Sequence, residues 1–209
     1  MNKLNLCLVS IVTSLLLGCS LSGLDQLGNG GAGTSPTGSI DGDPRLVGTW
    51  AAPCRTGSGS YEKSVLEITP SAISKRETFY SDSGCTQPVM ELTVTASKKL
   101  NEVSSSSGTQ YELDARANSA KFTSRNPSLV PAFQASSFCG ISAWALNVPQ
   151  EVIGKNCGGT IYFYPGQPVY LWLLTSIDEQ SLWLSEDDGD SYNPNARPDL
   201  DLVYTYTKQ

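Results

Sequence analysis

The residue types of this chain exclude several kinds of catalysis. Its 209 residues include no histidine, which removes Ser–His–Asp and Cys–His catalysis and every histidine-bound metal site. No Gly-x-Ser-x-Gly elbow, phosphate loop or dinucleotide fingerprint occurs in it. The 20 acidic residues offer carboxylate pairs for glycoside hydrolysis, but the sequence singles out no pair. We therefore expect no catalytic residue, no cofactor and a role other than enzyme, with a carboxylate-based hydrolase as an alternative.

The densest cluster of charge lies near the C-terminus. Residues 178–201 contain eight acidic residues and one basic residue, including a run from Glu186 to Asp190. Calcium prefers several carboxylates around a glycine turn, but the spacing differs from that of an EF-hand loop. We interpret the run as a solvated hairpin tip and expect no metal site. The net charge of −6 argues against nucleic acid as a partner.

The first 18 residues have the pattern of a signal peptide. Lys3 precedes an apolar run over residues 4–17, which is shorter than the roughly 20 apolar residues of a membrane-spanning helix. The pattern predicts a signal peptide over residues 1–18. An ordinary secretory signal is the simplest interpretation of these residues alone.

The end of this segment adds a more specific feature. The residues Leu16-Leu17-Gly18-Cys19 resemble the lipobox of bacterial lipoproteins. The resemblance implies that Cys19 is acylated on its sulfur, that the signal is cut before it, and that the new amine is acylated. Ser20, in place of aspartate, implies transport to the outer membrane. We therefore expect the protein in the bacterial cell envelope, anchored to the outer membrane through lipid.

A tether follows the lipidation site. Seven glycines fall between residues 20 and 44, and the segment has no hydrophobic periodicity with which to form a core. We expect residues 19–44 to be a flexible tether with a root-mean-square span of about 25–30 Å. The folded domain is then predicted over residues 45–209.

Four cysteines belong to that domain: Cys54, Cys85, Cys139 and Cys157. An even number in an exported domain predicts disulfides, with three possible connectivities. We favour Cys54–Cys85 and Cys139–Cys157, because neighbouring cysteines usually close short loops. A zinc site is the alternative, but no Cys-x-x-Cys spacing is present.

Short strands dominate the domain. Apolar and polar residues alternate over short stretches separated by turn residues, with no convincing helix except a short one near residues 128–135. The pattern predicts an all-β fold of eight to ten strands, and the short connections favour an antiparallel up-and-down barrel. Strands are expected over residues 46–52, 64–69, 72–80, 89–96, 109–115, 120–124, 160–164, 168–176, 181–185 and 201–207, with a turn at Asn118-Ser119.

The start of the first strand indicates which barrel this is. The residues Leu46-Val47-Gly48-Thr49-Trp50 resemble the Gly-x-Trp signature of lipocalins and other calycins. The resemblance implies an eight-stranded barrel in which Gly48 admits a close chain crossing and Trp50 plugs the closed end, as structural residues. It also implies a late arginine packed on the tryptophan, for which Arg197 is the candidate.

A narrower resemblance covers the cysteines. The Trp50–Cys54 segment, FYSDSGC over residues 79–85 and CGISAW over residues 139–144 resemble lipocalin-like extracellular domains of the adenomatosis polyposis coli down-regulated type. In that family a cysteine after the first strand pairs with one just past a Tyr-x-Asp hairpin.

Aromatic residues late in the chain suggest a ligand. Tyr170, Trp172 and Trp183 lie in two predicted strands and are candidates for lining a small apolar cavity inside the barrel. We expect a binding protein for a small apolar or amphipathic molecule. The alternative is a solid barrel that serves as an interaction or inhibitor module for another envelope protein.

Overall fold

The computed structural model describes residues 42–56, 60–104, 109–161, 163–176, 178–185 and 203–209. Antiparallel strands make up most of these residues, and helix is limited to two short segments among them. Cys19, Ser20, Arg197 and the acidic run from Glu186 to Asp190 lie outside the described residues.

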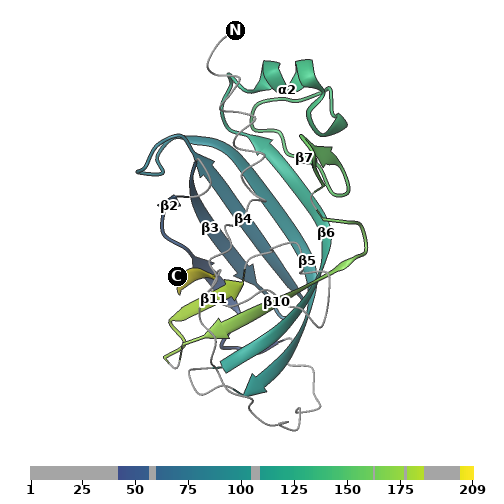
Figure 1. Ribbon diagram of the computed structural model, residues 1–209. Helices are drawn as coiled ribbons and strands as arrows, with labels where there is room; N and C mark the ends of the chain where they lie inside the picture. Colours follow the sequence, from purple (N-terminus) through teal and green to yellow (C-terminus); the bar gives the residue numbers. More distant parts are fainter. Residues whose placement is uncertain (1–41, 57–59, 105–108, 162, 177, 186–202) are drawn as a thin grey trace, which may run out of the picture.

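Eight of the described strands form a closed up-and-down barrel (Figure 1). Each pairs antiparallel with its neighbours, and β1 closes the ring because it pairs with both β3 and β12. The barrel predicted from the sequence is therefore confirmed. Its strands are β1 (Gly48–Ala51), β3 (Tyr61–Ile68), β4 (Ala72–Tyr80), β5 (Pro88–Ser104), β6 (Thr109–Ser124), β10 (Pro168–Thr175), β11 (Ser181–Ser185) and β12 (Val203–Lys208).

The two ends of the barrel differ in their connections. At one end β3 turns into β4 over residues 69–71, β1 begins and β12 finishes; we call it the closed end. At the other end β1 connects to β3 through β2 (Arg55–Thr56), β4 connects to β5, and β6 connects to β10. We call this second end the loop end.

Period-two alternation assigns the faces of the wall. In β3, Glu62, Ser64, Leu66 and Ile68 are buried, whereas the residues between them are more exposed. Because successive side chains of a strand point to opposite sides, the buried set faces the barrel interior. The same alternation holds in β10, where Val169 and Leu173 are buried.

A first hydrophobic cluster fills the closed end, and we call it the closed-end cluster. Its largest member is Trp50, which is fully buried. It draws side chains from every barrel strand, so it holds the ring together. Its buried members are Leu46, Trp50, Ala52, Leu66, Ile68, Ile73, Ala96, Leu100, Tyr111, Leu113, Ala115, Leu173, Leu182, Leu184 and Tyr206.

A cap segment, residues 125–161, covers the loop end beside β6 (Figure 1). It contains α2 (Val130–Ser136), which is the predicted short helix, the 3-10 turn η1 (Phe138–Gly140), β7 (Gln150–Glu151), β8 (Asn156–Cys157) and β9 (Thr160–Ile161). Together with the barrel strands at the loop end, the cap segment forms a second hydrophobic cluster, which we call the cap cluster. Its buried members are Phe79, Met90, Leu92, Ala120, Phe122, Leu129, Phe133, Cys139, Trp144, Val152 and Cys157.

The predicted turn at Asn118-Ser119 is wrong. β6 continues from Thr109 to Ser124 and pairs along its length with β5, with a register shift where Thr95 gives way to Ala96. A bulge accommodates the extra residue without reversing the chain. Glu151 fixes this point, because its carboxylate accepts from Ser119 Oγ at 2.6 Å and from the Ala120 amide at 2.8 Å.

Both disulfides form as predicted. Cys54–Cys85 joins the β1–β3 connection to the β4–β5 hairpin, and Cys139–Cys157 closes the cap segment. Each therefore constrains a connection at the loop end. Both clusters, both disulfides and the closed ring lie within residues 42–209. We call this range the domain fragment; it has a hydrophobic core of its own, which is what a domain needs in order to fold alone.

Candidate functional site

Two charged side chains interrupt the apolar inner face of β4. On this face Ile73 belongs to the closed-end cluster and Phe79 to the cap cluster. Lys75 and Glu77 occupy the two inward positions between them, by the period of the strand. Lys75 Nζ lies 2.7 Å from Glu77 Oε1. An ion pair thus sits inside the barrel, between its two hydrophobic clusters.

A second ion pair lies next to the first. Arg55 on β2 stands opposite Glu62 on β3, and Arg55 Nε donates to Glu62 Oε1 at 2.6 Å. Ser64 is the next inward-facing residue of β3 toward the closed end, and its Oγ lies 2.9 Å from Tyr206 Oη. We call the set of these inward-facing polar side chains the charged layer: Arg55, Glu62, Ser64, Lys75, Glu77 and Tyr206.

The strand register brings the charged layer together. Ser64 on β3 pairs with Glu77 on β4, so the Ser64 hydroxyl and the Lys75–Glu77 pair lie on adjacent strands. Tyr206 reaches them from β12, which lies on the other side of β1. Its phenol is within electrostatic range of Lys75, Glu77 and Arg55.

Burial controls the ionisation of Tyr206. Removal of the phenol from water raises its pKa, and this effect outweighs the opposing influence of Lys75 and of the hydrogen bond with Ser64. The hydroxyl therefore stays protonated at neutral pH. It contributes a neutral donor and acceptor beside two ion pairs.

Several inward-facing residues in the middle of the barrel are only partly buried. Lys75, Glu77, Val94, Ala117 and Leu171 all face inward by strand register, yet none of them is fully buried. The residues of the two clusters above and below them are buried. A barrel filled by its own side chains would bury such a ring as well. Of the charged layer, Arg55, Lys75 and Glu77 are therefore partly exposed, whereas Glu62, Ser64 and Tyr206 are buried.

The chemistry of the charged layer differs from that of a core that only fills space. Ion pairs inside a barrel are costly to desolvate, and apolar residues of similar size often serve stability as well or better. The charged layer supplies fixed charges and hydroxyl groups, and the partly exposed Val94, Ala117 and Leu171 supply apolar surface. Together they match the two kinds of contact that an amphipathic small molecule requires.

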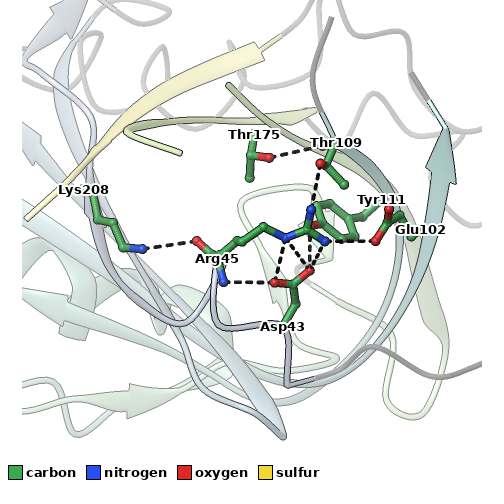
Figure 2. A network of polar contacts seen from close by, with 7 residues as sticks. All are labelled: Asp43, Arg45, Glu102, Thr109, Tyr111, Thr175 and Lys208. Atoms are coloured by element: carbon green, nitrogen blue, oxygen red, sulfur yellow. Dashed lines mark hydrogen bonds and ion pairs between the residues drawn. The ribbon is translucent and has the colours of Figure 1, made fainter. Parts of the chain in front are cut away.

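A separate polar network seals the closed end (Figure 2). Arg45 extends across it and makes several contacts with the Asp43 carboxylate, the shortest at 2.5 Å. The guanidinium also donates to Thr109 Oγ1 at 3.0 Å and to Glu102 Oε2 at 2.9 Å. Tyr111 Oη donates to Asp43 Oδ2 at 2.8 Å. Since Asp43 is buried here, the folded domain begins before the boundary predicted after residue 44.

The network fixes the charges of its members. Burial raises the pKa of Asp43, but hydrogen bonds from Arg45 and Tyr111 lower it by more, and the net shift is downward. Burial also raises the pKa of the Tyr111 phenol, and the hydrogen bond to Asp43 raises it further. Asp43 is thus a carboxylate and Tyr111 a neutral donor, which suits a structural role. We call this network of Asp43, Arg45, Glu102, Thr109 and Tyr111 the clasp.

The structure places the predicted cavity-lining aromatics on the outer side of the wall. Tyr170 and Trp172 alternate along β10 with Leu171 and Leu173, which contact the closed-end cluster. Trp183 likewise stands between the buried Leu182 and Leu184 on β11. Apolar residues occupy both faces of these strands, so sequence alternation alone could not assign the inward face. The placement of these three residues does not fit the prediction that they line the interior.

Gly48 and Trp50 occupy the positions expected of structural residues. Trp50 is fully buried, and its Nε1 donates to the Leu46 carbonyl at 2.9 Å. Gly48 has φ of +141°, which side-chain-bearing residues rarely adopt, while an added Cβ would meet Lys208 Cε only at 3.6 Å. Conformation therefore explains this glycine, and the close chain crossing that the resemblance implies is not seen at it. Trp50 is covered by Lys208, a residue that the sequence analysis did not identify.

Comparison with known proteins gives no family. No protein-family model matches the chain, and the search of curated proteins found no match. Within the described ranges, no helix has the length and apolar character needed to span a membrane. The barrel, its charged layer and its sealed end are therefore the basis for inferring function.

Proposed function

We propose that this protein is a non-catalytic binding protein that takes a small apolar or amphipathic molecule into its barrel. One observation carries the proposal: the inward-facing ring of Lys75, Glu77, Val94, Ala117 and Leu171 keeps access to solvent between two buried clusters. Apolar surface inside a closed barrel, with a few convergent polar groups, is what a small-molecule site needs.

A substitution that fills the barrel tests this proposal. Ala117 faces inward beside the bulge of β6, whereas the next residue, Asn118, is exposed. Ala117→Trp in the domain fragment should abolish binding of decan-1-ol, a neutral amphiphile, in isothermal titration calorimetry. Asn118→Trp adds the same ring at the neighbouring position and should leave binding intact. The absence of decan-1-ol binding to the unmodified fragment, or equal binding by both variants, would exclude the interior site.

The cellular setting of the proposal rests on the sequence. The lipobox-like Leu16–Cys19 segment supports lipidation of Cys19, and Ser20 supports transport to the outer membrane. Two or more acyl chains give stable anchoring, at about 0.8 kcal/mol for each buried CH₂ group. A Gly-rich tether would hold the barrel clear of the lipid headgroups. The ligand would then be met in the cell envelope.

An interaction module is the second candidate function. Leu146 and Val148 in the cap segment are large apolar residues with 41% and 44% of their surface exposed. Exposed apolar groups at a loop end favour contact with another envelope protein. In this function the barrel is a solid scaffold, so the domain fragment should not bind decan-1-ol, and Leu146→Ser/Val148→Ser should abolish the complex with the envelope protein.

A further inference from the structure

The two ion pairs of the charged layer share one orientation. In each pair the carboxylate is the more buried partner: the side chain of Glu62 is 8% exposed against 36% for Arg55, and that of Glu77 is 13% exposed against 27% for Lys75. All four residues face the barrel interior. The cations Lys75 and Arg55 are therefore the more exposed members of the two ion pairs, and the carboxylates of Glu77 and Glu62 lie deeper.

Such an arrangement favours negative charge at the accessible side. Each ion pair is a dipole whose positive end points toward solvent, so an entering anion lies nearer to the cation than to the carboxylate behind it. Coulomb energy falls with distance and rises as the effective dielectric constant drops inside the protein. The pairs therefore attract an anion even though their net charge is zero, and they repel a cation.

Apolar surface adjoins the accessible cations. Val94 stands opposite Lys75 in the pairing of β4 with β5, and it is half-buried against the cap cluster. Leu171 faces the same interior from β10 and packs on the closed-end cluster. A ligand whose anionic head meets Lys75 and Arg55 can thus place an apolar chain against these side chains.

From these contacts we infer that the barrel selects single-chain amphiphiles with an anionic head, which is held by Lys75 and Arg55. This inference rests on the proposed function, because it names the class of molecule that the same interior site takes. It adds that the head group of the ligand is negatively charged, which the binding of a neutral amphiphile does not require.

A series of head groups on one chain length tests the inference. Decanoate, decan-1-ol and decyltrimethylammonium are titrated into the domain fragment below their micelle-forming concentrations. Decanoate should bind at least about tenfold more tightly than decan-1-ol, the ratio expected for one hydrogen bond between charged groups. Decyltrimethylammonium should bind most weakly. Equal affinity for all three, or tighter binding of the cation, would overturn the inference and leave the proposed function standing. Binding of none would overturn both.

Paired substitutions locate the selectivity. Lys75→Gln alone would remove the ion-pair partner of the partly buried Glu77 carboxylate and threaten folding, so Lys75→Gln/Glu77→Gln removes both charges together. The double variant should lose the preference for decanoate over decan-1-ol while keeping its affinity for decan-1-ol. Arg76→Gln, on the exposed outer face of the same strand, is the matched control and should keep the preference. An unchanged preference in the double variant, with the barrel circular-dichroism spectrum intact, would assign the selectivity to other residues and contradict the inference.

Discussion

Lys208, the penultimate residue of the chain, lies over the ring of Trp50, with its Nζ 5.1 Å from the ring centroid. The register of β1 against β12 places the two residues directly opposite each other. The same amine donates to the Arg45 carbonyl at 3.2 Å. The last strand thus closes the barrel beside the fully buried Trp50. Its Lys208 also contacts Arg45 at the closed end (Figure 2).

Loss of the Lys208 amine should weaken this closure. Lys208→Met keeps most of the apolar stem but removes the cation over Trp50 and the hydrogen bond to Arg45. We expect the free energy of unfolding of the domain fragment to fall by about 1–2 kcal/mol, measured by urea denaturation. Lys99→Met, at an exposed position of β5, is the control and should change stability little. Equal effects of the two substitutions would show that the contact with Trp50 contributes nothing.

Truncation of Trp50 should have a larger effect. Trp50→Ala removes a fully buried indole and leaves a cavity at the closed end, so we expect a loss of about 3–5 kcal/mol. Thermal unfolding measures it. Trp183→Ala removes a half-buried indole from the outer face and should cost clearly less. Any loss of ligand binding by Trp50→Ala should follow the loss of folded protein. An unchanged melting temperature would remove the support for a plugging role.

Local patterns were sufficient to predict the barrel and its disulfides. Alternation in segments such as residues 64–69 and the turn residues Ser81 to Gly84 define hairpins one at a time, and an up-and-down barrel needs little more. Contacts across the closure could not be predicted in this way. Trp50 meets Lys208 only because the first and last strands pair, and nothing local connects residues so far apart in the sequence. Arg197, which the family resemblance implies as the partner of the tryptophan, lies outside the described residues.

The charged layer was missed for a different reason. Lys75 and Glu77 lie in the strand expected over residues 72–80, and the sequence analysis gives them no role. The spacing of these residues could have indicated their placement. Lys75 and Glu77 lie at every second position between Ile73 and Phe79, so all four share one face of the strand, and the structure buries Ile73 and Phe79. Tyr170 and Trp172 illustrate the opposite difficulty. Both faces of β10 are apolar, so alternation along the strand could not show which face is inward, and the larger side chains pointed to the wrong face.

The two disulfides should stabilise the loop end separately. Cys54 and Cys85 are 31 residues apart, and Cys139 and Cys157 are 18 apart. Replacement of either pair by serine should cost about 3 kcal/mol through the unfolded state, measured by thermal unfolding. Peptide mapping without reduction should recover Cys54 linked to Cys85, and Cys139 linked to Cys157. A peptide joining Cys54 to Cys139 or Cys157 would contradict the pairing and the hairpin geometry built on it.

Anchoring should depend on a single thiol. If Cys19 carries the lipid, Cys19→Ala in the full chain, expressed in a Gram-negative host, should give uncleaved precursor or soluble periplasmic protein, because neither the acyl chains nor the cleavage site remain. Membrane fractionation and the intact mass of the protein measure this. Cys7→Ala, within the expected signal, is the control and should leave anchoring unchanged. Normal partitioning of the Cys19→Ala chain into the outer membrane would contradict lipidation at this residue.

The Asp43 clasp should make stability depend on pH in a defined direction. Hydrogen bonds from Arg45 and Tyr111 hold the pKa of Asp43 below its unfolded value despite burial. Its contribution to stability is therefore fully present above the ordinary aspartate pKa of about 4 and is lost as the pH falls through the lower, folded-state pKa. Stability should thus fall with acidification below about pH 4.

Substitution of Asp43 should remove this dependence. Asp43→Asn deletes the ionisable group and leaves Arg45 without its main partner, so the variant should be less stable than the unmodified fragment at pH 7. The gap in free energy of unfolding should then narrow as the pH falls below about 4, because the unmodified fragment loses its carboxylate there as well. Tyr111→Phe removes only one of the hydrogen bonds to Asp43 and should give a curve of intermediate slope. Urea denaturation at a series of pH values supplies the measurement. Parallel curves for all three proteins would mean that the Asp43 carboxylate does not stabilise the closed end.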